Sequence, residues 1–103
     1  MNLLFIIADQ WRADSLGCAG NPVVQTPNLD RLAREGARFE KCFVQTAPCG
    51  PSRMCIYTGR YLCSHRAVHN KTPLIDAEDN LGFWLREGGH DPHLLGYNDY
   101  AVD

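Results

Sequence analysis

A cysteine opens the stretch of this sequence whose residue types best suit chemistry on an anion. The stretch runs from Cys49 to Arg60 and reads CGPSRMCIYTGR. Pro51 suits the first turn of a helix, because its φ is fixed near the helical value and its missing N–H costs nothing there. Gly59 can end such a helix in a left-handed conformation. We therefore predict a short helix over residues 52–58, with Cys49 at or just before its N-terminus.

This position makes Cys49 a candidate reactive group. Backbone N–H groups and the positive end of the helix dipole meet at a helix N-terminus, so an anion is favoured there. Arg53 follows about one turn later and offers a planar fork of donors to a sulfate- or phosphate-like group. The alternative is a capped surface helix in which Cys49 is an ordinary buried cysteine. This alternative would be favoured if a lone cysteine near a proline were the only signal.

A second candidate is the carboxylate of Asp9. It follows residues 3–8 (LLFIIA), a continuous apolar run that is typical of a parallel strand buried on both faces. Ligands of open α/β sheets bind outside the carboxyl ends of the strands. Asp9, followed there by Gln10, is thus a candidate ligand for a hard cation. The alternative is a cap of a turn or helix after the strand.

Two further helices are expected to position these groups. Residues 26–36 are predicted to be helical, with Thr26 as the cap and Gly36 as the stop. Residues 79–89 form the second, for which Asp79 is a candidate cap. Both carry apolar residues at helical spacing, so each has one face to pack against a sheet.

The expected sheet would contain three segments of the chain. These are residues 3–8, residues 37–44 (ARFEKCFV) and residues 93–97 (HLLGY), separated by the helices and by a loop over residues 15–25. Strands that alternate with helices are typical of an α/β fold. We therefore predict an α/β domain with a mostly parallel sheet flanked by helices.

Composition excludes several classes of function. The chain has 103 residues, the size of one small domain, with ten basic and twelve acidic residues and a net charge of −2. It has no basic block, so nucleic-acid binding has no electrostatic support. The apolar run at residues 3–8 is too short to span a membrane and lacks the features of a signal peptide. We expect a cytoplasmic protein without a membrane partner.

Cysteine and histidine spacing gives little support to a metal or redox module. The five cysteines are an odd number in a chain without a secretion signal, so free thiols are expected. Their spacings match neither a Cys-x-x-Cys pair nor a zinc knuckle. His65 and His69 are four residues apart, as two metal ligands on one helical face would be. No third ligand stands beside them, so a zinc site is the weaker interpretation.

The stretch from Cys49 to Arg60 resembles the sulfatase signature, in which Cys-x-Pro-Ser-Arg is followed by a short apolar run and Thr-Gly-Arg. The resemblance implies an alkaline-phosphatase-like fold and a hydrolase. It implies that a formylglycine-generating enzyme oxidises Cys49 to formylglycine (3-oxoalanine), which acts as the nucleophile and a metal ligand. It also implies that Arg53 is catalytic and that Asp9 binds a divalent metal, Ca, Mn or Mg.

Departures from that pattern resemble the phosphonate monoester hydrolase and arylsulfatase branch of the family. Gln10 stands where sulfatases keep a second metal-binding Asp, within the string DQWRAD. Asn70 lies in the string HRAVHN, and Tyr97 replaces the usual Lys after a glycine. The resemblance implies that Gln10, Asn70 and Tyr97 bind substrate, with weaker support for Arg66 and Asp99. The substrate would be a small-molecule sulfate, phosphonate or phosphate ester.

The resemblance covers essentially all 103 residues but only the front of the family. Family members supply further metal ligands and substrate contacts from later strands. We therefore expect residues 1–103 to be an N-terminal fragment of a sulfatase-like catalytic domain, inactive when isolated. A non-catalytic fragment that acts as a structural or interaction module is the alternative. A homo-oligomer is left open by the sequence.

Overall fold

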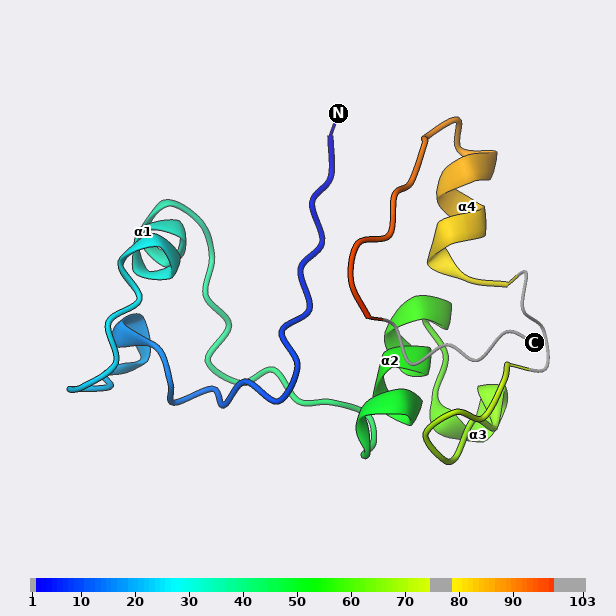
Figure 1. Ribbon diagram of the computed structural model, residues 1–103, viewed down its shortest axis with the longest axis horizontal. Coiled ribbons are helices and arrows are strands. Elements are labelled where there is room, and N and C mark those ends of the chain that lie inside the picture. The colour runs from blue at the N-terminus through cyan, green and yellow to red at the C-terminus, as the bar shows by residue number, and fades with distance from the viewer. Residues whose placement is uncertain (1, 75–78, 98–103) are drawn as a thin grey trace. The chain divides into compact units, whose positions relative to one another are not determined.

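The computed structural model describes residues 2–74 and 79–97, which belong to two compact units, Met1–Cys42 and Phe43–Asp103. The first unit contains a 3-10 helix, η1 (Gly17–Ala19), and one α-helix, α1 (Pro27–Glu35). The second contains α2 (Cys49–Thr58), α3 (Leu62–His65) and α4 (Leu81–Glu87) (Figure 1). The predicted helices over residues 26–36, 52–58 and 79–89 are thus present, with shifted ends.

The three predicted strands are not part of any ladder among residues 2–74 and 79–97. A strand requires a neighbour that bonds to its backbone N–H and C=O groups, and an apolar run alone does not supply one. Each segment instead carries exposed apolar side chains, such as Leu4, Phe39 and Leu95. The mostly parallel sheet therefore stays a prediction.

In the first unit, one carboxylate ties the loop that holds η1 to helix α1. Oδ1 of Asp30 accepts the Cys18 N–H at 2.8 Å and the Thr26 hydroxyl at 2.9 Å. These bonds, that from the Cys18 backbone above all, lower the pKa of Asp30. The Thr26 hydroxyl in turn accepts the Gly17 N–H at 2.9 Å. Thr26 is the N-cap residue of α1, as predicted, but its hydroxyl bonds to Gly17 and Asp30 and not to a backbone N–H of the helix.

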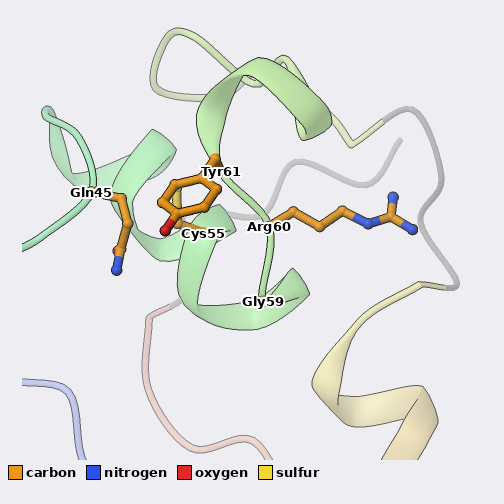
Figure 2. A pocket seen from close by; sticks show the side chains of 5 residues that line it. All are labelled: Gln45, Cys55, Gly59, Arg60 and Tyr61. Atoms are coloured by element: carbon orange, nitrogen blue, oxygen red, sulfur yellow. The ribbon is translucent and has the colours of Figure 1, made fainter.

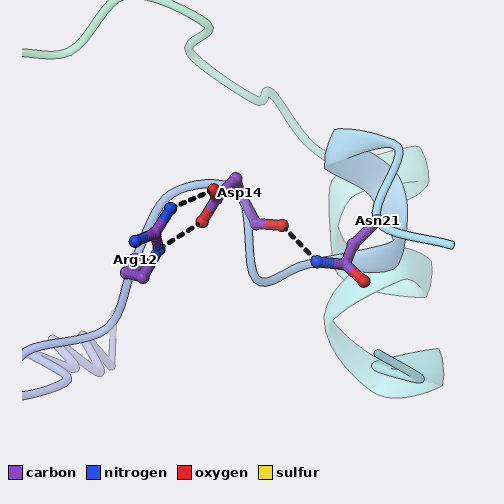
Figure 3. Close-up of polar contacts among 3 residues, drawn as sticks. All are labelled: Arg12, Asp14 and Asn21. Atoms are coloured by element: carbon purple, nitrogen blue, oxygen red, sulfur yellow. Dashed lines mark hydrogen bonds and ion pairs between the residues drawn. The ribbon is translucent and has the colours of Figure 1, made fainter. Parts of the chain in front are cut away.

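The segment after Gln10 is turned by a second polar cluster (Figure 3). Arg12 donates to both carboxylate oxygens of Asp14, at 2.9 and 2.5 Å. Asn21 donates from Nδ2 to the main-chain oxygen of Asp14 at 2.8 Å. The hydrogen bond from Arg12 holds the pKa of Asp14 below its ordinary value. Both charged side chains are exposed, so this pair fixes local geometry more than it stabilises the fold.

In the second unit, α2 is the helix around which the others pack. α3 and α4 both contact it. Met54 on α2 is 2% exposed and forms the apolar core with Ala67 and Leu74, against which Tyr57 packs. Such burial is the main stabilising contribution available to so short a helix.

The C-terminal end of α2 is as predicted, and its N-terminal end lies earlier. The helix begins at Cys49, three residues before the predicted start, so Pro51 is its third residue. Pro is still tolerated there, because none of the first-turn N–H groups has a partner within a helix. Gly59 ends the helix at φ 62°, in the left-handed conformation that was predicted.

Helix α4 is capped by Asn80, not by Asp79. Oδ1 of Asn80 accepts the N–H groups of Gly82 and Phe83, at 2.9 and 3.4 Å. The predicted cap, Asp79, instead forms an ion pair with Arg60. Among the described helices, none has the length and apolar character needed to cross a membrane.

Candidate active site

Cys49, Gly50 and Asn70 form a compact polar group at the first turn of α2. Oδ1 of Asn70 accepts the Gly50 N–H at 2.9 Å. Nδ2 of Asn70 lies 3.4 Å from Sγ of Cys49 and can donate to it. The half-buried Cys49 side chain is therefore covered on one side by an amide that comes from 21 residues later in the chain.

The bond to Gly50 fixes which way the Asn70 amide faces. Because the Gly50 N–H can bond only to an acceptor, the amide oxygen must point to it and the NH₂ group must point elsewhere. Sulfur is a weak acceptor. The Cys49 thiol can also donate to Oδ1 of Asn70, at 3.6 Å.

Gly50 is required by this close approach. A Cβ built on Gly50 would lie 2.8 Å from Oδ1 of Asn70 and 3.0 Å from its Cα. Glycine inside a helix is otherwise unfavourable by about 1 kcal/mol relative to alanine. Gly50 was not among the predicted site residues. A glycine between Cys49 and Pro51, at the expected start of a helix, is the signal that could have revealed it.

The first turn of α2 has few main-chain donors left for an anion. Of the four N–H groups that lack a helical partner, Pro48 and Pro51 have none to give. The third belongs to Gly50 and is used by Asn70. Within this described turn, that leaves the N–H of Cys49. An anion at this helix N-terminus would therefore find one main-chain N–H donor, that of Cys49. It would otherwise depend on the helix dipole and on nearby side chains.

Arg53 is one turn further along α2 and is 6% exposed. Nη1 donates to the main-chain oxygen of Tyr97 at 3.1 Å. The guanidinium also lies over the Tyr97 ring, 4.9 Å from its centroid. The structure therefore brings together four of the predicted site residues on or beside α2, namely Cys49, Arg53, Asn70 and Tyr97.

Asp9 and Gln10 belong to the other unit, and they form a turn directly after the apolar run. Gln10 has φ 51°, a left-handed conformation that is uncommon for a residue other than glycine. Unusual backbone at such a position is a reason to suspect function. Their predicted roles in metal and substrate binding stay predictions. Asp99 lies outside the described residues. Arg66 is exposed, and its weaker role stays a prediction.

Cys55 and His65 form a buried pair that spacing along the sequence did not reveal. Sγ of Cys55 lies 3.2 Å from Nε2 of His65, and the two side chains are 5% and 4% exposed. Burial raises the pKa of the Cys55 thiol and lowers that of the His65 imidazole, which nearby Arg60 lowers further. Both groups are neutral as a result, and a neutral thiol is a poor nucleophile.

A zinc site on His65 and His69 is not formed in the described part of the chain. His65 is buried against Cys55 at the end of α3, whereas His69 is exposed and lies outside that helix. Among residues 2–74 and 79–97, no three His, Cys, Asp or Glu side chains come together as metal ligands. All five cysteines are free thiols, as predicted.

A small open pocket lies beside the Cys55 end of α2 (Figure 2). Its volume is about 190 Å³, and its lining comes from Gln45, Cys55, Gly59, Arg60 and Tyr61. Figure 2 shows the Arg60 side chain extending away from Gln45 and Tyr61. None of the predicted catalytic or substrate-binding residues lines this pocket, so it is not the candidate active site.

The divalent metal implied by the sequence fits these residues only in part. Carboxylate and other oxygen donors suit Ca²⁺, Mg²⁺ and Mn²⁺. Asp9 offers one such group, and an oxygen on residue 49 would offer another. The described residues hold no cluster of three such ligands.

Comparison with known proteins gives one family. The family model described as Sulfatase matches residues 1–102. The chain is 46% identical to the multifunctional alkaline phosphatase superfamily protein PehA of Trinickia caryophylli, covering 99% of this chain and 21% of that protein. It is 32% identical to an N-acetylglucosamine-6-O-sulfatase of Bacteroides thetaiotaomicron, covering 92% of this chain and 17% of that protein.

A solved structure agrees with these matches. The phosphonate monoester hydrolase of Agrobacterium radiobacter has a TM-score of 0.84 and 49% identity to this chain. The match covers 93% of this chain and 19% of that structure. The chain therefore spans about a fifth of the length of the proteins that it matches. The similarity supports the predicted α/β class, while the parallel sheet remains untested.

Proposed function

The chain belongs to the sulfatase family, and from that premise we propose that its protein hydrolyses small-molecule sulfate, phosphonate or phosphate esters with residue 49 as the nucleophile. One observation carries the proposal. Residue 49 lies at the first turn of a helix, under the amide of Asn70, with a nearly buried arginine one turn away. This arrangement suits attack on a tetrahedral anionic centre.

In this proposal, each side chain near residue 49 has a different role. The Asn70 N–H orients the nucleophilic atom, because it donates to the side chain of residue 49. The Arg53 guanidinium stabilises the negative charge that builds up on the non-bridging oxygens, and preorganised donors of this kind are often the largest catalytic contribution. The ring of Tyr97 lies against that guanidinium, and we assign its hydroxyl a hydrogen bond to a substrate oxygen.

Two groups complete the proposed chemistry when they are present. Formylglycine at position 49, made by a formylglycine-generating enzyme, would add water across its aldehyde, and one hydroxyl of the resulting diol would be the oxygen nucleophile in place of sulfur. Asp9 would be one ligand of a divalent metal, which would lower the pKa of that hydroxyl and neutralise substrate charge. The Asn70 N–H that lies 3.4 Å from Sγ would donate more strongly to an oxygen at that place.

Within the family, we favour a phosphonate or phosphate ester hydrolase with arylsulfatase activity. The similarity to PehA and to a phosphonate monoester hydrolase supports this choice. Gln10 supports it as well, because the string DQWRAD resembles that branch of the family.

The test uses the whole protein encoded by the gene, purified together with a formylglycine-generating enzyme. Its turnover of a nitrophenyl sulfate and of a nitrophenyl phenylphosphonate is compared with that of Cys49→Ala. We expect hydrolysis of both esters, faster on the phosphonate, and loss of at least about 10³-fold in kcat/KM in the variant. Cys63→Ala, at an exposed thiol, is the matched control and should behave as wild type. Equal turnover by wild type and Cys49→Ala would remove residue 49 from the mechanism.

A further inference from the structure

Residues 65–70 form a short segment, called the strap here, that runs along α2 in the opposite direction. At one end His65 contacts Cys55, and at the other Asn70 contacts Gly50 and Cys49. Between them, Ala67 is 1% exposed and packs against Met54. The strap is thus attached to α2 at both ends and in the middle.

The length of the strap has to be matched to the helix. Cys55 and Gly50 are five residues apart, which is about 7.5 Å along a helix axis. His65 and Asn70 are also five residues apart, but five extended residues would reach about 17 Å. The strap must therefore be contracted. Arg66 provides the contraction, because it has φ 57°, a left-handed conformation that ends α3.

His65 holds this contracted turn through both nitrogens of its ring. Nδ1 accepts the N–H of Ala67 at 3.1 Å, so it carries no proton. In the neutral imidazole the proton is then on Nε2, which donates to Sγ of Cys55. One side chain thereby joins the turn at Arg66 to helix α2. The left-handed arginine is unfavourable by itself, so the turn depends on such support.

We propose that His65 is a positioning residue for residue 49, acting through the strap that delivers the Asn70 amide. The imidazole does not touch Cys49. It sets the place where the chain leaves α3, and hence where Asn70 meets the first turn of α2. This inference deepens the proposed function. The expected effect of His65 on hydrolysis rests on that function, whereas its effect on the position of Asn70 can be measured without any ester hydrolysis.

The first measurement uses the protein produced without a formylglycine-generating enzyme, so that Cys49 remains a thiol. The rate of iodoacetamide labelling at Cys49 is followed by peptide mass spectrometry in wild type, Asn70→Ala, His65→Gln and the double variant. We expect both single variants to change the rate by the same factor, about threefold or more, and in the same direction. The double variant should show no further change, because His65 acts through Asn70. Labelling of the exposed Cys63 is the internal reference.

A matched histidine and a second variant keep the result interpretable. His69→Gln changes an exposed histidine of the same strap and should label as wild type does. Cys55→Ala removes the acceptor of the Nε2 proton without altering the imidazole, and should reproduce His65→Gln. This variant serves as the test if His65→Gln fails to fold. Independent effects of His65 and Asn70, or an unchanged rate in Cys55→Ala, would overturn the proposal.

The same variants are then assayed as converted enzyme. We expect His65→Gln to lower kcat by about tenfold with little change in KM, and to add nothing to Asn70→Ala. Coupled labelling in a protein that hydrolyses neither ester would leave the positioning role standing and refute the proposed function. Normal hydrolysis of the esters, together with independent effects of His65 and Asn70 on labelling, would refute the positioning role and leave the proposed function standing.

Discussion

Arg53 is joined to Tyr97 through two different parts of that residue, its main-chain oxygen and its ring. The oxygen accepts from Nη1 at 3.1 Å, and the ring centroid lies 4.9 Å from the guanidinium carbon. A substitution at Tyr97 can remove the ring without removing the main-chain bond. The contribution of the hydroxyl, the ring and the backbone can therefore be measured separately.

Replacing Tyr97 tests the first two contributions. Tyr97→Phe keeps the stacked ring and loses the hydroxyl that we assign to the substrate, so kcat/KM should fall by about 5- to 10-fold. Tyr97→Ala also loses the cation–π contact and should fall by about 30-fold or more. Initial rates on both nitrophenyl esters provide the measurement. A phenylalanine variant with wild-type kcat/KM would assign Tyr97 to holding Arg53 alone.

Arg53→Lys tests whether charge alone is sufficient at that position. Lysine keeps the charge but loses the planar fork and the flat surface that stacks on Tyr97. We expect kcat/KM to decrease by about 10²-fold or more with a small change in thermal stability. Arg86→Lys, at an exposed arginine over the ring of Phe83, is the control and should not change the rate. Retention of at least half the activity in Arg53→Lys would contradict the assigned role.

Gly50→Ala should destabilise the protein, although helix propensity alone predicts the opposite. Alanine would gain about 1 kcal/mol in a helix interior. Its Cβ would however lie 2.8 Å from Oδ1 and 3.0 Å from Cα of Asn70, and overpacking of this kind costs about 1 to 3 kcal/mol. A lower Tm is the expected result. In an Asn70→Ala background the clash with the side chain is absent, so the loss in Tm should be smaller there. Stabilisation by Gly50→Ala would mean that Asn70 does not lie against this turn.

Stability should decrease in mild acid because of His65. Its pKa is lowered below the ordinary 6.5 by burial and then by Arg60. The unfolded chain therefore takes up the proton first, so this contribution is complete above about pH 6.5 and is lost as the pH falls through the lowered pKa. Cys55, the other titrating group that faces the ring, has a raised pKa and acts only in the alkaline range.

The measurement is Tm between about pH 8 and about pH 5, in wild type and in His65→Gln. The wild type should lose more Tm than the variant over this range, because the variant has no imidazole to protonate. The exposed His69 gives the control, since His69→Gln should follow the wild-type curve. Identical curves for wild type and His65→Gln would show that His65 is not the group responsible.

Asn80→Ala should lower stability by about 0.5 to 2 kcal/mol through loss of the cap of α4. Asp79→Asn is the informative partner variant, because it removes the ion pair with Arg60 and leaves the cap in place. Its effect should be smaller, since the Arg60 side chain is 45% exposed and pairs open to solvent contribute little. Thermal unfolding of both variants measures the two losses of stability. A larger loss in Asp79→Asn would indicate that Asp79, and not Asn80, caps α4.

Local signals in the sequence were sufficient to predict α1, α2 and α4 and the place of Cys49, but not η1 or α3. Pro51 marks the first turn of α2 and Gly59 its end, because the backbone preferences of these residues need no knowledge of the rest of the fold. The resemblance of short strings to a family brought Asn70 and Tyr97 into the site, and the structure places both beside α2. These predictions depend on residues that carry their own conformational information.

The predictions that failed depend on contacts between elements. Asp79 and Asn80 are equally good cap residues, and the ion pair with Arg60 separates them only once the chain is folded. A zinc site on His65 and His69 was only the weaker interpretation of their spacing, and the two residues share no helix because α3 ends at His65. The partnership of His65 with Cys55 requires α3 to pack on α2, and no periodicity in the sequence encodes that packing.

The carboxylate of Asp30 has a consequence for how the first unit opens. It holds the Cys18 amide directly and the Gly17 amide through the Thr26 hydroxyl. The Cys18 amide loses protection when its bond to Asp30 breaks. The Gly17 amide loses protection when the Thr26 hydroxyl, which is held by Asp30, moves away from the loop. In amide hydrogen exchange the two amides should behave as one cooperative unit with a single opening free energy. Replacing Asp30 with asparagine should make both exchange faster together, while amides in the middle of α1 change little.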